Sequence, residues 1–292
     1  MWHEQKVGIG VRVLVEGSLG FAATNRLTKK AVKTAVSEAF KKAKGGLSLM
    51  SRPIEFSEEF MGRANYSVLS KKDPEDVPIE EKIALHTESW KRIADVGTEA
   101  KIVNLMLTYQ ESVEEKIVVN SDGAFVMGIV PRISVFYNIV ALHPQRGALQ
   151  FMEDLAASGG YECVEKWDVV DNAYRHAKTL DNILSKAKAP PTDKPIDVIL
   201  GSRVVGLMVH ESCGHPSEAD RILGREAAQA GKSFMKPEML GERIGSEVVT
   251  IIDDPTLPGS FGFYLYDDEG VPARPRYLYL KGVINEHLHN RW

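Results

Sequence analysis

The sequence has only two cysteines in 292 residues, Cys163 and Cys213. Thiols this few and this far apart predict free side chains in a reducing compartment, and they exclude a disulfide-stabilised secreted scaffold. Long apolar runs are also missing. The longest candidates, residues 129–142 and 198–209, each contain an arginine and are shorter than the roughly 20 residues of a membrane-spanning helix. Residues 1–6 do not resemble a signal peptide. We therefore expect a cytoplasmic protein that does not enter a membrane.

An excess of positive charge is absent as well. The formal net charge is −4, which gives no electrostatic footprint for nucleic acid or for an anionic membrane surface. We expect neither of these as a partner. The remaining composition, 43% apolar and 26% charged residues, is ordinary for a globular protein.

The chain is long enough for two domains. Its clearest linker is residues 189–195, which contain three prolines among polar residues, a composition that marks loops. We place the boundary there. The prediction is an N-terminal α+β domain over residues 1–189 and a second domain over residues 190–292.

The apolar periodicity predicts an α+β fold of antiparallel sheets with flanking helices. Thr28 is a candidate cap for a helix that ends before Gly45. A second, longer helix is expected over residues 164–187, and Pro131 is expected to interrupt a run of strands. The strands predicted around it are residues 101–109, 114–120, 124–130 and 132–142.

The second domain contains the run His210-Glu211-Ser212-Cys213-Gly214-His215. Two imidazoles can hold a zinc ion, and a carboxylate beside them can activate zinc-bound water. The common zinc-peptidase motif spaces its histidines four residues apart on a helix, whereas here the spacing is five. Five residues of a regular helix turn about 500°, which leaves the histidines about 140° apart. A π-type turn would bring them into line, and Gly214 offers backbone freedom beside it.

The residues before the motif predict a buried setting. Residues 197–200 are an apolar run typical of a buried strand, and residues 203–209 form a helix that is apolar nearly all round. His210 and Glu211 would then enter a low-dielectric interior, where they need a metal or a dense hydrogen-bond network. The alternative is a satisfied polar cluster at a helix end without a metal.

Several sequence blocks follow one another along nearly the whole chain: residues 11–25, 210–220, 241–245, 249–254 and 266–270. Their order resembles the TldD/PmbA family of metallopeptidases, and the histidine pair resembles its TldD branch, because the PmbA branch generally lacks these ligands. The resemblance implies that His210 and His215 are zinc ligands and that Glu211 is the general base.

Family members are longer than this chain, which is therefore expected to be truncated at both ends or to be a short relative. Their third zinc ligand is a cysteine in a later portion, and no residue here occupies its position. His287 and His289 are candidate substitutes, although their alternation in a strand-like segment favours exposure instead. Glu218 and Asp220 are candidates to orient a ligating imidazole, or else plain surface acids.

The predicted activity is zinc-dependent hydrolysis of unfolded or extended peptides, with Glu211 activating the zinc-bound water. The resemblance further implies a PmbA-like partner subunit in a heterodimer, with a homodimer as the alternative. Three other hypotheses remain open. In the first, the chain is a catalytically inactive fragment or binding remnant without a third ligand. In the second, Cys213 is a nucleophile activated by His215. In the third, the substrate is a non-peptide amide. The acids Asp267 to Glu269 are interpreted as a turn rather than a calcium site.

Overall fold

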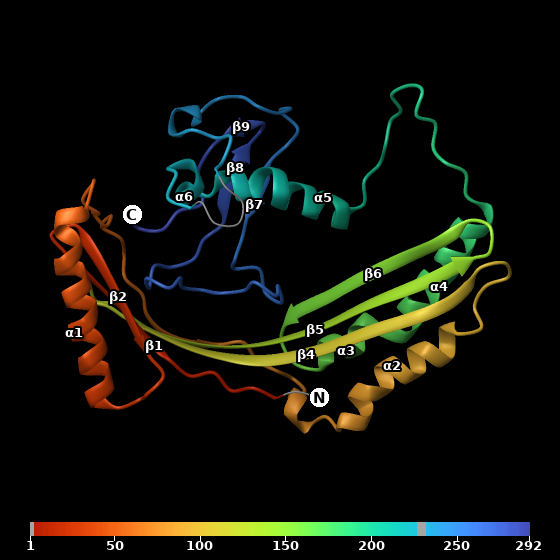
Figure 1. The fold of residues 1–292 in the computed structure, drawn as a ribbon, viewed down its shortest axis with the longest axis horizontal. Helices are drawn as coiled ribbons and strands as arrows, with labels where there is room; N and C mark the ends of the chain where they lie inside the picture. Colours follow the sequence, from red (N-terminus) through yellow and green to blue (C-terminus); the bar gives the residue numbers. More distant parts are fainter. Residues whose placement is uncertain (1–2, 227–231) are drawn as a thin grey trace. The chain divides into compact units, whose positions relative to one another are not determined.

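The computed structural model describes residues 3–226 and 232–292. Its contacts group into two units, residues 1–59 with 289–292 and residues 60–288. This grouping differs from the predicted boundary at residue 189, which stays a prediction. The fold is the expected α+β mixture of antiparallel sheets and helices (Figure 1). None of the helices in the described part of the chain is long and apolar enough to cross a bilayer.

The first unit is a β-hairpin covered by one helix. Strands β1 (Ile9–Val15) and β2 (Ser18–Thr24) pair antiparallel around Glu16 and Gly17, which both have positive φ, as a two-residue type I′ hairpin turn requires. The Thr28 side chain caps helix α1 (Lys29–Gly46), accepting from the Ala31 N–H, as predicted. Gly20 of β2 lets the helix approach closely, because a Cβ there would lie 1.9 Å from the Ala39 carbonyl oxygen.

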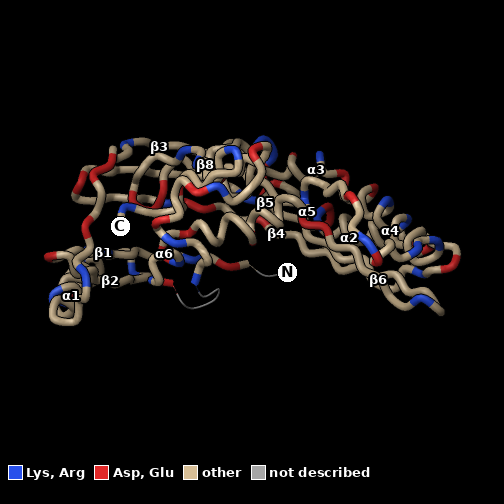
Figure 2. The backbone as a smooth tube through the Cα atoms, turned by 90° about the horizontal axis from the view of Figure 1, so that it is seen from above, with Lys and Arg blue, Asp and Glu red and all other residues tan. Residues whose placement is uncertain are grey.

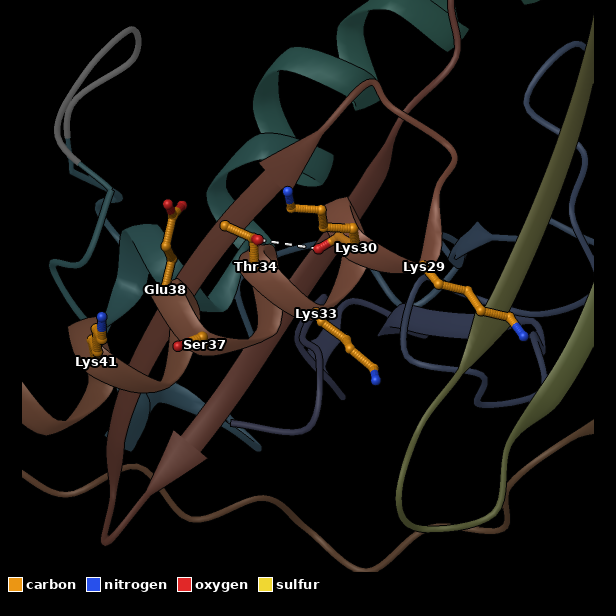
Figure 3. Close-up of a pocket in the computed structure, with 7 residues that line it drawn as sticks. All are labelled: Lys29, Lys30, Lys33, Thr34, Ser37, Glu38 and Lys41. Atoms are coloured by element: carbon orange, nitrogen blue, oxygen red, sulfur yellow. Dashed lines mark hydrogen bonds between the residues drawn. The ribbon is translucent and has the colours of Figure 1, made fainter.

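The outer surface of α1 carries most of the lysines of this unit. Figure 3 shows their side chains extending outward from the helix, with one hydrogen bond among the drawn residues, from Thr34 to the Lys30 carbonyl. These residues line only a shallow depression, and all of them are solvent-exposed or half-exposed. We interpret this surface as a solvated helix face. The lining residues are Lys29, Lys30, Lys33, Thr34, Ser37, Glu38 and Lys41.

The second unit is built on one long sheet that is antiparallel except for one short parallel strand. Strand β5 (Phe125–His143) is its centre and pairs along its whole length with β4 (Lys101–Val119). On its other side β5 pairs first with the parallel strand β3 (Arg63–Ser67) and then with the antiparallel strand β6 (Gly147–Ser158). The sheet therefore contains two strands of 19 residues where four shorter ones were predicted.

Pro131 does not interrupt β5, so the predicted break is wrong. Its carbonyl oxygen accepts from Gly159, on the side of β5 that faces away from β4, and a strand residue directs its N and its C=O to the same side. The pairing with β3 ends at Ile129, and the pairing with β6 begins at Arg132. The proline nitrogen thus lies where no ladder bond is lost.

Helices cover one face of this sheet and form the main core. Alternate residues of β5 point into it and are fully buried. They pack with residues of α2 (Ile79–Ile93) and α4 (Val169–Lys186). The long helix predicted over 164–187 is broken, because Asp168 adopts a left-handed φ of 50° between α3 (Glu162–Trp167) and α4. The main buried side chains are Ile93, Ile133, Val135, Tyr137, Ile139, Ala173, Ala177 and Leu180.

The remaining elements of the second unit surround the histidine motif. They include helix α5 (Ser202–Val209), a π-helical turn, a 3-10 turn, the short helix α6 (Ala219–Ile222), and a small sheet of β7 (Ile251–Asp253), β8 (Arg276–Leu280) and β9 (Val283–Ile284). Acidic and basic residues are interspersed along the backbone (Figure 2). The short remaining 3-10 turns are η1 (Leu47–Leu49), η2 (Pro74–Asp76) and η5 (Pro237–Met239).

Candidate metal centre

A π-helical turn carries the histidine motif. Helix α5 ends at Val209, the turn spans His210–Gly214, and the N–H of His215 donates to the carbonyl of His210. This i to i+5 bond widens the turn and places the two histidines one above the other. The π-type turn predicted from the five-residue spacing is therefore confirmed. A 3-10 turn, His215–Ser217, follows with Pro216 inside it.

Glycine is not required within this turn. Gly214 has a φ of −61°, which any residue adopts. A Cβ there would meet only the Val209 carbonyl oxygen, at 3.7 Å. The backbone freedom that Gly214 offers is therefore not used, because the π-type bond forms with right-handed dihedral angles on both sides of it.

The turn brings three potential metal donors together. The ring centroids of His210 and His215 lie 4.4 Å apart at an interplanar angle of 71°. One ligand atom from each histidine and one from Glu211 all lie within 4.8 Å of one another. Imidazole nitrogen and carboxylate oxygen are ligands that zinc accepts. The donor set and its convergence therefore fit a zinc ion.

Two further side chains hold the His215 ring. Its Nδ1 lies 2.6 Å from Oε1 of Glu218, and Arg221 pairs with the same carboxylate while its Nη2 lies 3.0 Å from Nδ1. In the tautomer with the proton on Nδ1, that proton is donated to Glu218, and the lone pair on Nε2 remains for a metal. Arg221, which has only donor groups, then acts through its pair with the Glu218 carboxylate. Glu218 therefore holds the His215 ring, one of the two roles expected for it from the sequence. The Asp220 carboxylate instead accepts from the N–H of Arg221, and the Asp220 backbone carbonyl accepts from the N–H groups of residues 225 and 226.

A small core lies below the turn. Ser217 is fully buried, and residues 217–219 are fixed by backbone hydrogen bonds to and from Leu288. Cys213 packs beside Met235 and Tyr279 in this core. One side of the turn is thus anchored, while the side chains of His210 and Glu211 are each 61% exposed.

The predicted burial of the helix before the motif is wrong. The apolar side chains of α5 are exposed, with Val204 at 50%, Leu207 at 63% and Met208 at 49%. Residues 197–200 are not a strand, and Ile199 is fully exposed. An apolar composition favours burial of a segment, but burial also requires a neighbouring surface that packs against it. Within residues 3–226 and 232–292, no strand pairs with residues 197–200.

Comparison with protein-family models covers most of the chain. A model described as PmbA/TldA metallopeptidase domain 1 matches residues 3–43, the central-domain model matches residues 72–181, and the C-terminal-domain model matches residues 192–292. The three matches follow in chain order. This chain belongs to the PmbA/TldD metallopeptidase family. The resemblance seen in the sequence blocks is thereby confirmed for the family, while the TldD branch stays a prediction.

Individual PmbA/TldD relatives agree with this. The chain is 32% identical to the metalloprotease MJ0996 of Methanocaldococcus jannaschii over 97% of its own length and 59% of the relative. It is 24% identical to a zinc metalloprotease TldD homolog of Saccharolobus solfataricus, over 99% of its length and 60% of the relative. The crystal structure of TldE from Thermococcus kodakarensis has a similar fold, with a TM-score of 0.62 at 20% identity, covering 95% of this chain and 58% of that one. The chain thus spans about three fifths of the length of these proteins.

The other metal ligands considered from the sequence do not join the three donors of the histidine motif. His287 and His289 do not belong to the group of donors that the described residues form. The Asp267 side chain accepts from the N–H groups of Glu269 and Val271, which supports the turn interpretation over a calcium site. Arg221 was not among the residues predicted for the site, although its position three residues after Glu218 on a helical turn was a usable signal.

Glu218 gives a testable expectation for this PmbA/TldD site. Glu218→Gln keeps the size of the side chain but weakens its hold on the His215 Nδ1–H, so we expect zinc affinity to fall by about 10- to 100-fold. A competition titration against a chromophoric chelator measures it. Glu238→Gln, at an exposed glutamate, is the matched control. Equal affinities in the two variants would contradict the orienting role.

Proposed function

We propose that this chain carries the metal-binding and general-base residues of a zinc-dependent, TldD-type peptidase. One observation supports the proposal above all others: the π-helical turn aligns His210 and His215 and holds Glu211 beside them. The His210 Nε2 lies 3.9 Å from Oε1 of Glu211, so a group bound by the imidazoles lies within reach of the carboxylate. The presence of both histidines is what favours the TldD branch.

Zinc is the metal we propose, held by His210 and His215. A catalytic zinc site normally takes three protein ligands and keeps one position open. If Glu211 is the base, the third ligand comes from outside this group of three donors. Neither Cys163 nor Cys213 belongs to the group, and we propose that the third ligand is supplied by another segment or subunit of the assembled enzyme.

Glu211 performs the proton transfers in this mechanism. When bound, zinc supplies a Lewis acid that polarises the scissile carbonyl and lowers the pKa of water. The Glu211 carboxylate accepts one proton from the attacking water as its oxygen bonds to the carbonyl carbon. It then delivers that proton to the leaving nitrogen as the C–N bond breaks. Glu218 holds the His215 ring in one tautomer throughout.

The proposed substrates are unfolded or extended peptides, and the proposed partner is a PmbA-like subunit. An extended peptide can bind as an added strand through main-chain hydrogen bonds, which gives affinity with little side-chain selectivity. The family membership supports a peptide substrate in general terms. The structure of TldE from Thermococcus kodakarensis has a similar fold, which favours a partner of the same architecture.

The competing thiol mechanism has a structural counterargument. Burial raises the pKa of the Cys213 thiol, and a catalytic cysteine needs a lowered one. Cys213 also packs into the small core beside Tyr279 and not toward the two imidazoles.

Inhibitor sensitivity separates the two mechanisms. We expect 1,10-phenanthroline to abolish hydrolysis of an unfolded protein such as reduced casein, added zinc to restore it, and iodoacetamide to leave it intact, because a zinc site and not a thiol carries the chemistry. The isomer 1,7-phenanthroline, which cannot chelate, is the control. Inhibition by iodoacetamide alone, or no hydrolysis by the zinc-loaded protein, would contradict the proposal.

A further inference from the structure

Glu153 is a largely buried carboxylate that the proposed mechanism does not use. It lies on β6, and its side chain is 16% exposed. A buried carboxylate is unfavourable unless it is paired. Its two oxygens face two cations or potential cations: Oε1 pairs with Arg203, and Oε2 lies 3.7 Å from Nε2 of His176.

Residues of the core hold the imidazole of His176, which in turn faces the Glu153 carboxylate. His176 of α4 stacks on Phe151, with ring centroids 3.9 Å apart, and its Nδ1 lies 2.8 Å from the hydroxyl of the fully buried Tyr137. Burial raises the pKa of Tyr137 and lowers the pKa of His176. Tyr137 therefore keeps its proton and donates it to Nδ1, while Nε2–H faces the carboxylate. His176 is thus held half-buried in this network.

Arg203 stands in a position that helix stability alone does not favour. It is the second residue of α5, and a cation near a helix N-terminus opposes the helix dipole, whereas the Glu153 carboxylate there complements it. The helix also begins at Gly201 without a side-chain cap. A charge that conflicts with local preference is a sign of a tertiary or functional role.

The ion pair is also a direct link between this helix and the sheet. Residues 188–208 are all exposed, so apolar burial does little to hold α5. Arg203 precedes His210 by seven residues, which puts both on nearly the same face of the helix. Fixing the start of the helix on β6 therefore limits both its rotation and the direction in which the imidazoles point.

We propose that Glu153 and Arg203 are positioning residues that hold the metal-binding helix on the central sheet in the orientation that the histidine pair requires. The proposal rests on the metal site described under the proposed function. It assigns to the central sheet a direct part in shaping that site, through the chain Tyr137, His176, Glu153 and Arg203.

The test uses the full chain with Arg203→Met and Glu153→Gln, each of which removes one charge at similar size. Arg203→Lys is the conservative variant. Lys82→Met is the matched control, because it breaks another ion pair between a helix and the same sheet, that of Lys82 on α2 with Glu111 on β4. The first measurement is hydrogen exchange of residues 204–215 in metal-free protein. The second is cobalt binding, followed by the visible spectrum of the Co²⁺ ion.

Arg203→Met and Glu153→Gln are expected to speed exchange in residues 204–215 and to weaken cobalt binding by about three- to ten-fold, with a changed spectrum. Arg203→Lys should keep most of the slow exchange and most of the cobalt affinity. Lys82→Met should change neither the exchange of residues 204–215 nor the cobalt affinity. Unchanged exchange in Arg203→Met, or equal acceleration in Lys82→Met, would overturn the proposal. If the unaltered chain binds no cobalt, the metal site fails, while the exchange data still decide whether the ion pair holds the helix.

Discussion

Glu211→Gln is expected to lower kcat for peptide hydrolysis by at least about 100-fold, the lower end of what a positioned general base contributes. The amide has the same shape as the carboxylate but cannot accept the proton of the attacking water. Zinc binding should persist, because both imidazoles remain and the His215 ring is still held by Glu218. The result would thus be a metal-loaded protein that is nearly inactive.

Single-turnover hydrolysis of a quenched fluorescent peptide, beside zinc content by elemental analysis, measures both effects. Glu247→Gln is the matched control, since Glu247 is exposed and lies outside the motif. Equal loss of zinc and activity in Glu211→Gln would mean that Glu211 is a ligand. Activity within a few fold of the unaltered protein would mean that another group is the base.

The geometry of the motif could be predicted from spacing because helical angles are fixed by backbone hydrogen bonding. A spacing of five residues, from His210 to His215, does not align the two side chains on an α-helix, and a π-type turn is the local change that aligns them. The structure forms that turn. Local geometry of this kind needs no knowledge of the rest of the fold.

The setting of the motif could not be predicted in the same way. The apolar sequences of residues 197–200 and 203–209 indicate a need for burial, yet burial depends on which surfaces the rest of the assembly provides. In the described chain these residues are exposed. The same holds for Pro131 within a strand. Whether its missing N–H costs a hydrogen bond depends on which strand faces it, and the local sequence does not show this.

Networks between distant elements were the least predictable part of the site. Arg203 is 50 residues from Glu153, and His176 is 39 residues from Tyr137. Each of these residues reads as an ordinary surface or core residue by itself. Only the pairing of β6 with β5, and the packing of α4 on the sheet, bring them together. The contact between Glu218 and His215 was foreseeable because it lies within one turn.

His215→Ala is expected to remove bound zinc almost completely. The change deletes one of two imidazole donors and frees Glu218 from its hydrogen bond. The loss of affinity should exceed the roughly 10- to 100-fold that follows from removing only a hydrogen-bond partner of a ligand. The zinc content of the purified chain, measured by elemental analysis, should therefore fall from near one zinc per chain to near none.

His289→Ala controls for loss of an imidazole elsewhere. His289 is exposed, and its Nδ1 contacts the Asn290 carbonyl. The zinc content of the His289→Ala variant should therefore match that of the unaltered chain. Near one zinc per chain, lost only in His215→Ala, would show that a third ligand is completed by this chain or its oligomer. Zinc retained in His215→Ala would remove His215 from the site. Little zinc in every variant would contradict a third ligand within this chain or its oligomer and would leave another subunit as its source, because a catalytic zinc normally takes three protein ligands.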